Sequence, residues 1–203
     1  MSFTLDEIRY SIKKLKNNKA SGADKVINEF FKFCHVNCMQ LIVDFFNIVL
    51  NTGCVPTDWC LGTIYPLYKN KGSMTDPDNY RGITLLSCTG KLFTACLNHR
   101  LSCYVEENIL GEEQAWFREG YSTIDHVFVL HIIIELYKSV HKRVYCAFVD
   151  YRKAFDSINR PLLWQKLLSY GIKGKMLNVI TNMYSKAKSC IQSGNLLSEY
   201  FLC

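Results

Sequence analysis

The chain has 203 residues, of which 49% are hydrophobic, 13% aromatic and 21% charged. This composition excludes an intrinsically disordered chain and is sufficient for one large domain, or one and a half small ones, with a buried core. The net charge of +6 is compatible with a polyanionic partner but does not require one, because many basic proteins bind no nucleic acid.

Ten cysteines are scattered through apolar stretches, and their spacing bears on metal binding and redox state. No Cys-x-x-Cys motif occurs, and the pair formed by Cys34 and Cys38, with His35 between them, lacks a matching second pair of ligands. The spacing therefore favours reduced thiols that pack as small core residues inside a cell over a zinc site.

The N-terminal segment carries the acidic residues Asp6 and Glu7 and lacks the apolar core of a signal peptide. The longest apolar runs, such as residues 128–134, are far below the roughly 20 residues that a membrane-spanning helix needs. We therefore expect an intracellular protein, in the cytoplasm, the nucleus or both, with no membrane partner.

The first quarter of the chain predicts two helical regions. Thr4 and Glu7 have the spacing of a capping box that opens a short amphipathic helix. The lysines that follow, up to Gly22, fit a solvated helix end and a phosphate contact equally well. Residues 28–50 carry apolar side chains at nearly every turn and predict a largely buried helical region that ends at Gly53.

Residues 61–69 and 80–86 are β-leaning runs on either side of a segment rich in Gly, Asp, Asn and Ser. They predict an antiparallel ribbon whose strands are joined by a loop or a long hairpin connection. Helical periodicity returns over residues 91–105. A capping-box pattern that begins at Ser122 predicts another helix, to about Ser139.

An apolar run of strand length, residues 144–149, stops at Asp150. Such a run is typical of a strand that is covered on both faces. A carboxylate at the edge of an apolar core costs several kcal/mol unless it is paired, and a divalent cation used in catalysis is one such partner. The alternative is that Asp150 caps the following turn. We interpret Asp156 as a helix cap or turn residue.

The C-terminal part of the chain predicts two helices and a hairpin. Pro161 suits the first position of a helix that ends at Gly171, and a second helix follows to about Lys186. Two short strands are expected around Gly194.

The segment FVDYRKAFD, residues 148–156, resembles motif A of the reverse transcriptases of non-LTR retrotransposons, which is a strand of the polymerase palm. The resemblance covers nearly the whole chain in the order of the family. The further matching segments are residues 17–22 and 29–32 for the N-terminal helical extension, 56–69 and 76–86 for the two fingers strands, and 114–123 for the following fingers motif.

The resemblance implies an α+β fold, in which helix-rich fingers of a right-hand polymerase are joined to an incomplete palm. It implies an N-terminal helical extension at residues 1–55, fingers at 56–142 and a partial palm at 143–203. The implied function is RNA-directed DNA synthesis by two-metal nucleotidyl transfer. RNA template, DNA primer and deoxynucleoside triphosphates are the implied partners.

The resemblance also assigns roles to single residues. Asp150 is the expected catalytic residue, and it holds Mg²⁺ together with the backbone carbonyl of Tyr151. The residues assigned to the incoming deoxynucleoside triphosphate are Lys69 and Arg81, at its phosphates, and Ala154 and Phe155, of which Phe155 lies under the sugar and screens out the 2′-hydroxyl of a ribonucleotide. The residues assigned to the template are Gln114, Phe117 and Arg118. Cations on the fingers ribbon agree with the chemistry, because phosphoryl transfer passes through a highly charged transition state.

The chain departs from the family pattern at Trp116, where the family usually has glycine, and at residues 23–25, which lack the usual Pro-Asp-Gly turn. It also stops before the glycine-containing motif B and the Tyr-Ala-Asp-Asp turn of motif C. We therefore expect a truncated polymerase, without the C-terminal palm and thumb of its parent protein, that does not extend a primer alone.

Two alternatives to a polymerase of this kind follow from the sequence. One is a non-catalytic RNA-binding remnant of a decayed mobile element, whose affinity for RNA would fall steeply with salt. The other is a group II intron maturase, which the signatures at residues 79–83 and 153–156 disfavour.

Overall fold

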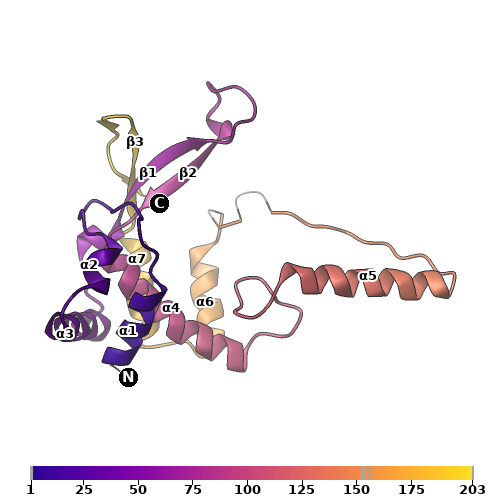
Figure 1. Ribbon diagram of the computed structural model, residues 1–203, viewed down its shortest axis with the longest axis horizontal. Coiled ribbons are helices and arrows are strands. Elements are labelled where there is room, and N and C mark those ends of the chain that lie inside the picture. Colours follow the sequence, from indigo (N-terminus) through magenta and orange to yellow (C-terminus); the bar gives the residue numbers. More distant parts are fainter. Residues whose placement is uncertain (1, 152–153, 156, 203) are drawn as a thin grey trace. The chain divides into compact units, whose positions relative to one another are not determined.

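The computed structural model describes residues 2–151, 154–155 and 157–202, and its mixture of helices with one sheet confirms the predicted α+β class (Figure 1). The chain divides into two compact units. Unit 1 comprises Met1–Arg100 and Trp164–Cys203, and unit 2 comprises Leu101–Leu163. Helices α4 (Cys88–Asn108) and α6 (Arg160–Ser169) both cross the boundary between the units.

Unit 1 begins with the helices α1 (Leu5–Lys14), α2 (Asn28–Lys32) and α3 (Val36–Thr52). The capping box predicted for α1 is present, since the Thr4 hydroxyl accepts the Glu7 N–H and the Glu7 carboxylate accepts the Thr4 N–H at 2.8 Å. The helical region predicted over residues 28–50 is two helices. They are separate because His35 caps the start of α3, where its Nδ1 accepts the Asn37 N–H at 3.3 Å.

The core of unit 1 lies between α1, α3, α4 and α7 (Lys175–Ser185). Phe46 of α3 is fully buried and packs edge-to-face against Phe93 of α4, with 5.1 Å between the ring centroids. Gly53 ends α3 as predicted, with a left-handed φ of 69°. Its carbonyl accepts a hydrogen bond from the Asn182 side chain at 3.0 Å, which ties the end of α3 to α7.

Within the described residues one sheet contains β1 (Leu61–Tyr68), β2 (Tyr80–Leu85), β3 (Lys188–Ser193), β4 (Leu196–Leu197) and β5 (Phe201–Leu202). The strand order is β2-β1-β3-β4, and β5 also pairs with β3. The predicted antiparallel ribbon is confirmed as β1 and β2, and the predicted C-terminal hairpin as β3 and β4. Figure 1 shows the ribbon of β1 and β2 extending from the helices of unit 1.

Two short 3-10 helices lead into the ribbon strands, η1 (Thr57–Cys60) before β1 and η2 (Pro77–Asn79) before β2. The sequence does not predict the parallel pairing of β1 with β3, which joins Leu61 to Lys188 and Ile64 to Ile191. This pairing anchors the base of the ribbon to the C-terminal segment of the chain.

The loop between α1 and α2 passes over the junction between β2 and α4. The Ser87 hydroxyl donates to the Asp24 carboxylate at 2.7 Å and accepts the Gly90 N–H at 3.1 Å. Gly22 comes so close that a Cβ at this position would meet the carbonyl group of Leu86 and lie 2.7 Å from the Ser87 nitrogen. The close approach therefore requires glycine.

Unit 2 contains the end of α4, helix α5 (Thr123–Ser139) and the segments around them. The capping box predicted for α5 is present, since the Asp125 carboxylate accepts the Ser122 N–H at 3.0 Å. Ala115 is the one hydrophobic residue of unit 2 that is buried among those described. The apolar side chains of α5, such as Phe128, are largely exposed.

The strand predicted over residues 144–149 does not form in the structure, so that prediction is wrong. Phe148 and Val149 are exposed by 85% and 75%. An extended apolar segment becomes a strand only by hydrogen bonding to neighbouring strands, and none of the described strands pairs with this one. Asp150 therefore does not lie at the end of a buried strand.

Helix α6 begins one residue before Pro161, and the Asn159 side chain accepts the Leu162 N–H at 3.1 Å at its start. The role predicted for Asp156, as a cap or turn residue, lies outside the described residues.

All cysteines that the structure describes are free thiols. Burial raises the pKa of Cys96 to about 11. In the part of the chain that is described, no group of three or more His, Cys, Asp or Glu side chains is arranged to hold a metal ion. Over the same residues, no helix combines the length and apolar character needed to cross a membrane.

Candidate functional site

One exposed face of the β1–β2 ribbon carries both of the basic residues that the sequence assigns to the triphosphate. Arg81 on β2 lies opposite Leu67 on β1. The pairing continues past β1, because the Lys69 N–H donates to the Asn79 carbonyl at 2.9 Å. Since side chains two residues apart on a strand share a face, Lys69 projects on the same side as Leu67 and Arg81. The register therefore places two exposed basic residues at diagonal positions of the ribbon.

The loop beyond the ribbon holds Lys69 in place. The Lys69 ammonium group donates to the Asp78 carbonyl at 2.8 Å, and the Asp76 carboxylate accepts the Asp78 N–H at 3.0 Å. The Tyr68 hydroxyl donates to the Gly72 carbonyl on the other side of the loop. An ammonium group has three donors, so the bond to Asp78 leaves Lys69 able to bind an anion as well.

The residues that the sequence assigns to the metal ion and to the sugar lie in unit 2, after α5. Asp150, Tyr151, Ala154 and Phe155 are all exposed, the two aromatic residues by 76% and 73%. Carboxylate and carbonyl oxygens are ligands that Mg²⁺ prefers, and Mg²⁺ is often held by one or two carboxylates together with substrate phosphates. Asp150 and the Tyr151 carbonyl are therefore donors of the type that magnesium accepts.

Arg118 holds together the loop that connects α4 to α5. Its Nε donates to both carboxylate oxygens of Glu106, at 2.9 and 3.1 Å, and its Nη1 donates to the carbonyls of Gly111 at 2.6 Å and Gln114 at 3.0 Å. The guanidinium group also stacks on the Tyr121 ring, 3.9 Å from its centroid. With its side chain only 7% exposed, Arg118 is directed into its own loop.

The structure brings together two further residues from the sequence assignment. The rings of Phe117 and Phe155 meet edge to face, with 5.9 Å between their centroids and 82° between their planes. The Gln114 side chain donates back to the Trp116 carbonyl at 3.4 Å. Sequence reasoning misses Glu106 and the ring under Arg118, because no spacing pattern links a helix end to a loop residue 12 positions later.

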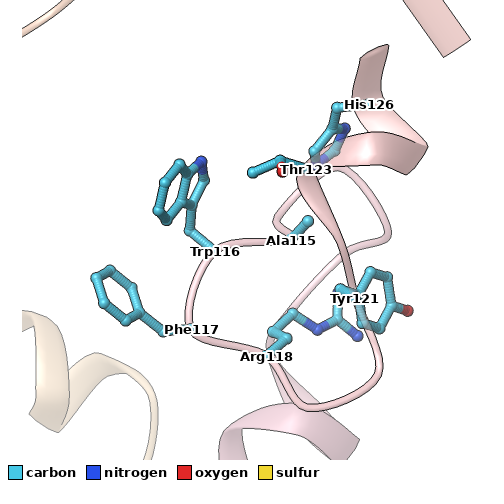
Figure 2. Close-up of a pocket in the computed structure, with 7 residues that line it drawn as sticks. All are labelled: Ala115, Trp116, Phe117, Arg118, Tyr121, Thr123 and His126. Carbon is cyan, nitrogen blue, oxygen red and sulfur yellow. The ribbon is translucent and has the colours of Figure 1, made fainter. Parts of the chain in front are cut away.

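A pocket of about 200 Å³ lies beside this loop. Figure 2 shows Trp116 and Phe117 projecting on the side opposite to Arg118, whose guanidinium group lies against Tyr121. The residues that line the pocket are Ala115, Trp116, Phe117, Arg118, Tyr121, Thr123 and His126.

Comparison with known proteins defines the class to which this chain belongs. The family model described as reverse transcriptase (RNA-dependent DNA polymerase) matches residues 68–202, which is more than half of the chain. The match includes the ribbon cations, the Arg118 loop and the segment of Asp150. The chain therefore belongs to the reverse transcriptase family.

The relatives place the chain within that family. It is 31% identical over 159 residues to the probable RNA-directed DNA polymerase from transposon BS of Drosophila melanogaster, covering 76% of this chain and 17% of that protein. It is 30% identical over 167 residues to the RNA-directed DNA polymerase from mobile element jockey of the same species, covering 80% and 18%. It is of the non-LTR retrotransposon type, as the resemblance implies.

A more distant match extends further along the chain. The retrovirus-related Pol polyprotein from type-1 retrotransposable element R2 of Popillia japonica is 28% identical over 193 residues, which is 93% of this chain and 25% of that protein. The chain thus spans between 17% and 25% of the length of these relatives.

Proposed function

We propose that the chain supplies the fingers and the first part of the palm of an RNA-directed DNA polymerase, which copies RNA into DNA by two-metal nucleotidyl transfer. In this proposal residues 1–55 are the N-terminal helical extension, residues 56–142 the fingers and residues 143–203 the partial palm. Membership of the reverse transcriptase family supports the class of reaction. The observation that carries the proposal is the pair of cations on one face of the ribbon.

Lys69 and Arg81 bind the triphosphate of the incoming deoxynucleotide in this proposal. Their register puts them on one exposed face at diagonal positions, which long side chains can bridge. The planar guanidinium group of Arg81 can hold two phosphate oxygens at once, whereas the Lys69 ammonium group acts as a compact charge on a flexible stem. Together they offset the charge that develops as the phosphoryl group is transferred.

Asp150 and the Tyr151 carbonyl would hold Mg²⁺, which when bound supplies Lewis-acid stabilisation of the transferring phosphate. Ala154 and Phe155 lie beside the sugar in the same proposal. The Phe155 ring offers the sugar a flat apolar surface, on which a 2′-hydroxyl would lose hydration without gaining a hydrogen-bond partner. This favours deoxynucleotides over ribonucleotides.

The partners proposed for the polymerase are an RNA template and a DNA primer, and the net charge of +6 suits both. Two-metal transfer needs carboxylate ligands in addition to the one at Asp150. We therefore expect the 203-residue chain by itself not to extend a primer.

The test measures Mg²⁺-dependent incorporation of dTTP on poly(rA) with an oligo(dT) primer, by the product of the whole reading frame that contains this chain. We expect Arg81→Ala and Lys69→Ala each to raise the KM for dTTP about ten- to a hundredfold, since a hydrogen bond to a charged group contributes about 1.5–3 kcal/mol. Asp150→Asn should abolish incorporation.

Lys71→Ala is the matched control, because Lys71 is an exposed lysine in the same loop but outside the paired ribbon. It should leave the KM unchanged. Incorporation that survives Asp150→Asn, or equal effects at Lys71 and Lys69, would rule out the assignment.

A further inference from the structure

The pocket beside the α4–α5 loop has a rigid base that Arg118 provides. The guanidinium group is engaged by the Glu106 carboxylate, by two loop carbonyls and by the Tyr121 ring. A cation with these partners is poorly placed to bind a phosphate from outside. Arg118 is therefore a positioning residue, and the groups that it positions are the neighbouring aromatic side chains.

The backbone of the loop is strained where it presents those side chains. Phe117 has a φ of +64°, a region that bulky residues rarely adopt and that persists only where surrounding contacts impose it. The Arg118 contacts are such a constraint. The result is a Phe117 ring that is 84% exposed and supported from the side by Phe155.

Trp116 precedes this strained residue and is 64% exposed. Its ring centroid lies 6.1 Å from that of Phe117, with 51° between the ring planes, so the two rings are neighbours whose faces point in different directions. Figure 2 shows Thr123 and His126 at the other side of the pocket, with the indole nitrogen directed toward them. The pocket thus combines an aromatic wall with hydrogen-bonding groups opposite it.

The size and chemistry of this pocket select one class of ligand. About 200 Å³ is below the roughly 300–1,000 Å³ of most small-molecule pockets and suits a single planar ring system. Nucleobases bind proteins by stacking on exposed aromatic rings while their edges form hydrogen bonds. An apolar protein segment would leave the polar groups of Thr123 and His126 without partners.

We propose that this pocket binds one unpaired nucleobase of single-stranded RNA, stacked on the indole of Trp116. Thr123 and His126 face the edge of the base, and the tilted Phe117 ring borders the indole on one side. The proposal rests on the proposed function, in which RNA is the template. It assigns a role to the position where this chain carries tryptophan in place of the glycine usual in the family.

The test measures the affinity of the 203-residue chain for fluorescently labelled oligo(rA) of about 12 nucleotides, by anisotropy. An abasic ribose-phosphate oligomer of the same length provides the charge without the bases. Stacking contributes about 1–3 kcal/mol per base, so Trp116→Leu should weaken oligo(rA) binding about five- to a hundredfold and leave abasic binding unchanged. Trp116→Tyr keeps an aromatic ring and should retain most of the affinity, which a loop that had unfolded could not do.

Phe33→Ala is the matched control, because Phe33 is also an exposed aromatic residue, at 83%, and lies far from the pocket in sequence. It should change neither affinity. The ratio of the two affinities for oligo(rA), of the unmodified chain and of Trp116→Leu, should stay the same as the salt concentration rises. The affinities themselves should both fall, because the contribution of charge weakens with salt.

Equal affinities of the unmodified chain and Trp116→Leu for oligo(rA) would overturn the nucleobase pocket and leave the polymerase assignment intact. If Trp116→Leu lost as much affinity for the abasic oligomer as for oligo(rA), the nucleobase pocket would be overturned as well, because the loss would then not depend on a base. If neither oligomer binds, the RNA partner of the proposed function is contradicted together with the pocket.

Discussion

Arg100 on α4 binds the Glu7 carboxylate, with 2.6 Å between its Nε and Oε1, and its guanidinium group lies 4.3 Å from the centroid of the Phe3 ring. The same carboxylate closes the capping box of α1. Chiefly because of the Arg100 hydrogen bond, the pKa of Glu7 is lowered from its usual 4.5 to about 2. Glu7 therefore links the start of the chain to the core helix α4.

We predict that Glu7 makes folding stability depend on pH in acid. A carboxyl group whose pKa is lower in the folded state contributes stability above its unfolded value, here 4.5, and loses it as the pH falls toward 2. Glu7→Gln should reduce the free energy of unfolding by about 1–2 kcal/mol at neutral pH. It should also make the free energy of unfolding fall less steeply as the pH drops from 4.5 to about 2. Urea titrations at several pH values measure both effects.

Asp6→Asn is the control for this prediction, because the Asp6 side chain is 92% exposed beside Glu7. If the free energy of unfolding of Glu7→Gln fell as steeply with decreasing pH as that of the unmodified chain, groups other than Glu7 would cause the pH dependence.

Single residues also show the limit of sequence reasoning. The antiparallel pairing of the two strands that carry Lys69 and Arg81 could be predicted, because the strand signals and the polar connection between them are local. The role of Arg118 could not, since its partners come from a helix end and from two carbonyls that no side-chain pattern reveals. The sequence assigns Arg118 to the template, whereas its contacts are internal to the loop.

At the scale of elements, the junction of the α1–α2 loop with β2 and α4 depends on Gly22. A Cβ there would meet main-chain atoms of Leu86 and Ser87, which cannot rotate away as a side chain can. We predict that Gly22→Ala reduces the free energy of unfolding by about 1–3 kcal/mol, as overpacking does elsewhere. Denaturant unfolding followed by circular dichroism measures the change.

Ala23→Ser adds one atom at the next position, which is exposed, and should shift stability by less than about 0.5 kcal/mol. If Gly22→Ala proved as mild as Ala23→Ser, the close approach at the junction would not exist in solution.

The elements that could be predicted are those with local signals. Capping boxes at Thr4 and Ser122 open α1 and α5 where expected, and Gly53 ends α3. The break before α3 was not predictable, because histidine is an uncommon cap. The parallel pairing of β1 with β3 joins segments that are far apart in the chain, and the sequence of neither strand indicates that it pairs with the other.

At the scale of the whole molecule, the two units differ in how they bury apolar side chains. Unit 1 has a continuous core, whereas most of the described hydrophobic residues of unit 2 are exposed. In the apolar run at residues 144–149, every residue after Val144 is exposed. The hydrophobic pattern of a segment indicates that it is suited to a buried strand. Whether the segment is buried depends on neighbouring segments, which its own sequence does not specify.

We predict that amide protons of residues 144–149 exchange with solvent at rates close to those of an unstructured peptide. The amides of β1 that are paired with its neighbours should exchange at least about a hundredfold more slowly. Hydrogen–deuterium exchange read out by mass spectrometry compares the two segments within one sample. Protection of residues 144–149 as strong as that of β1 would mean that this segment is hydrogen-bonded in solution.

The central claim is that the exposed face of the β1–β2 ribbon binds a nucleoside triphosphate through Lys69 and Arg81. The most direct measurement is the rate at which an amine-acetylating reagent modifies Lys69 and Lys71 of the 203-residue chain, with and without Mg²⁺ and dTTP. At a dTTP concentration about ten times the dissociation constant, Lys69 should react about tenfold more slowly while Lys71 is unchanged. A Lys69 that reacts at the same rate with dTTP, or a Lys71 that is equally protected, would contradict the claim.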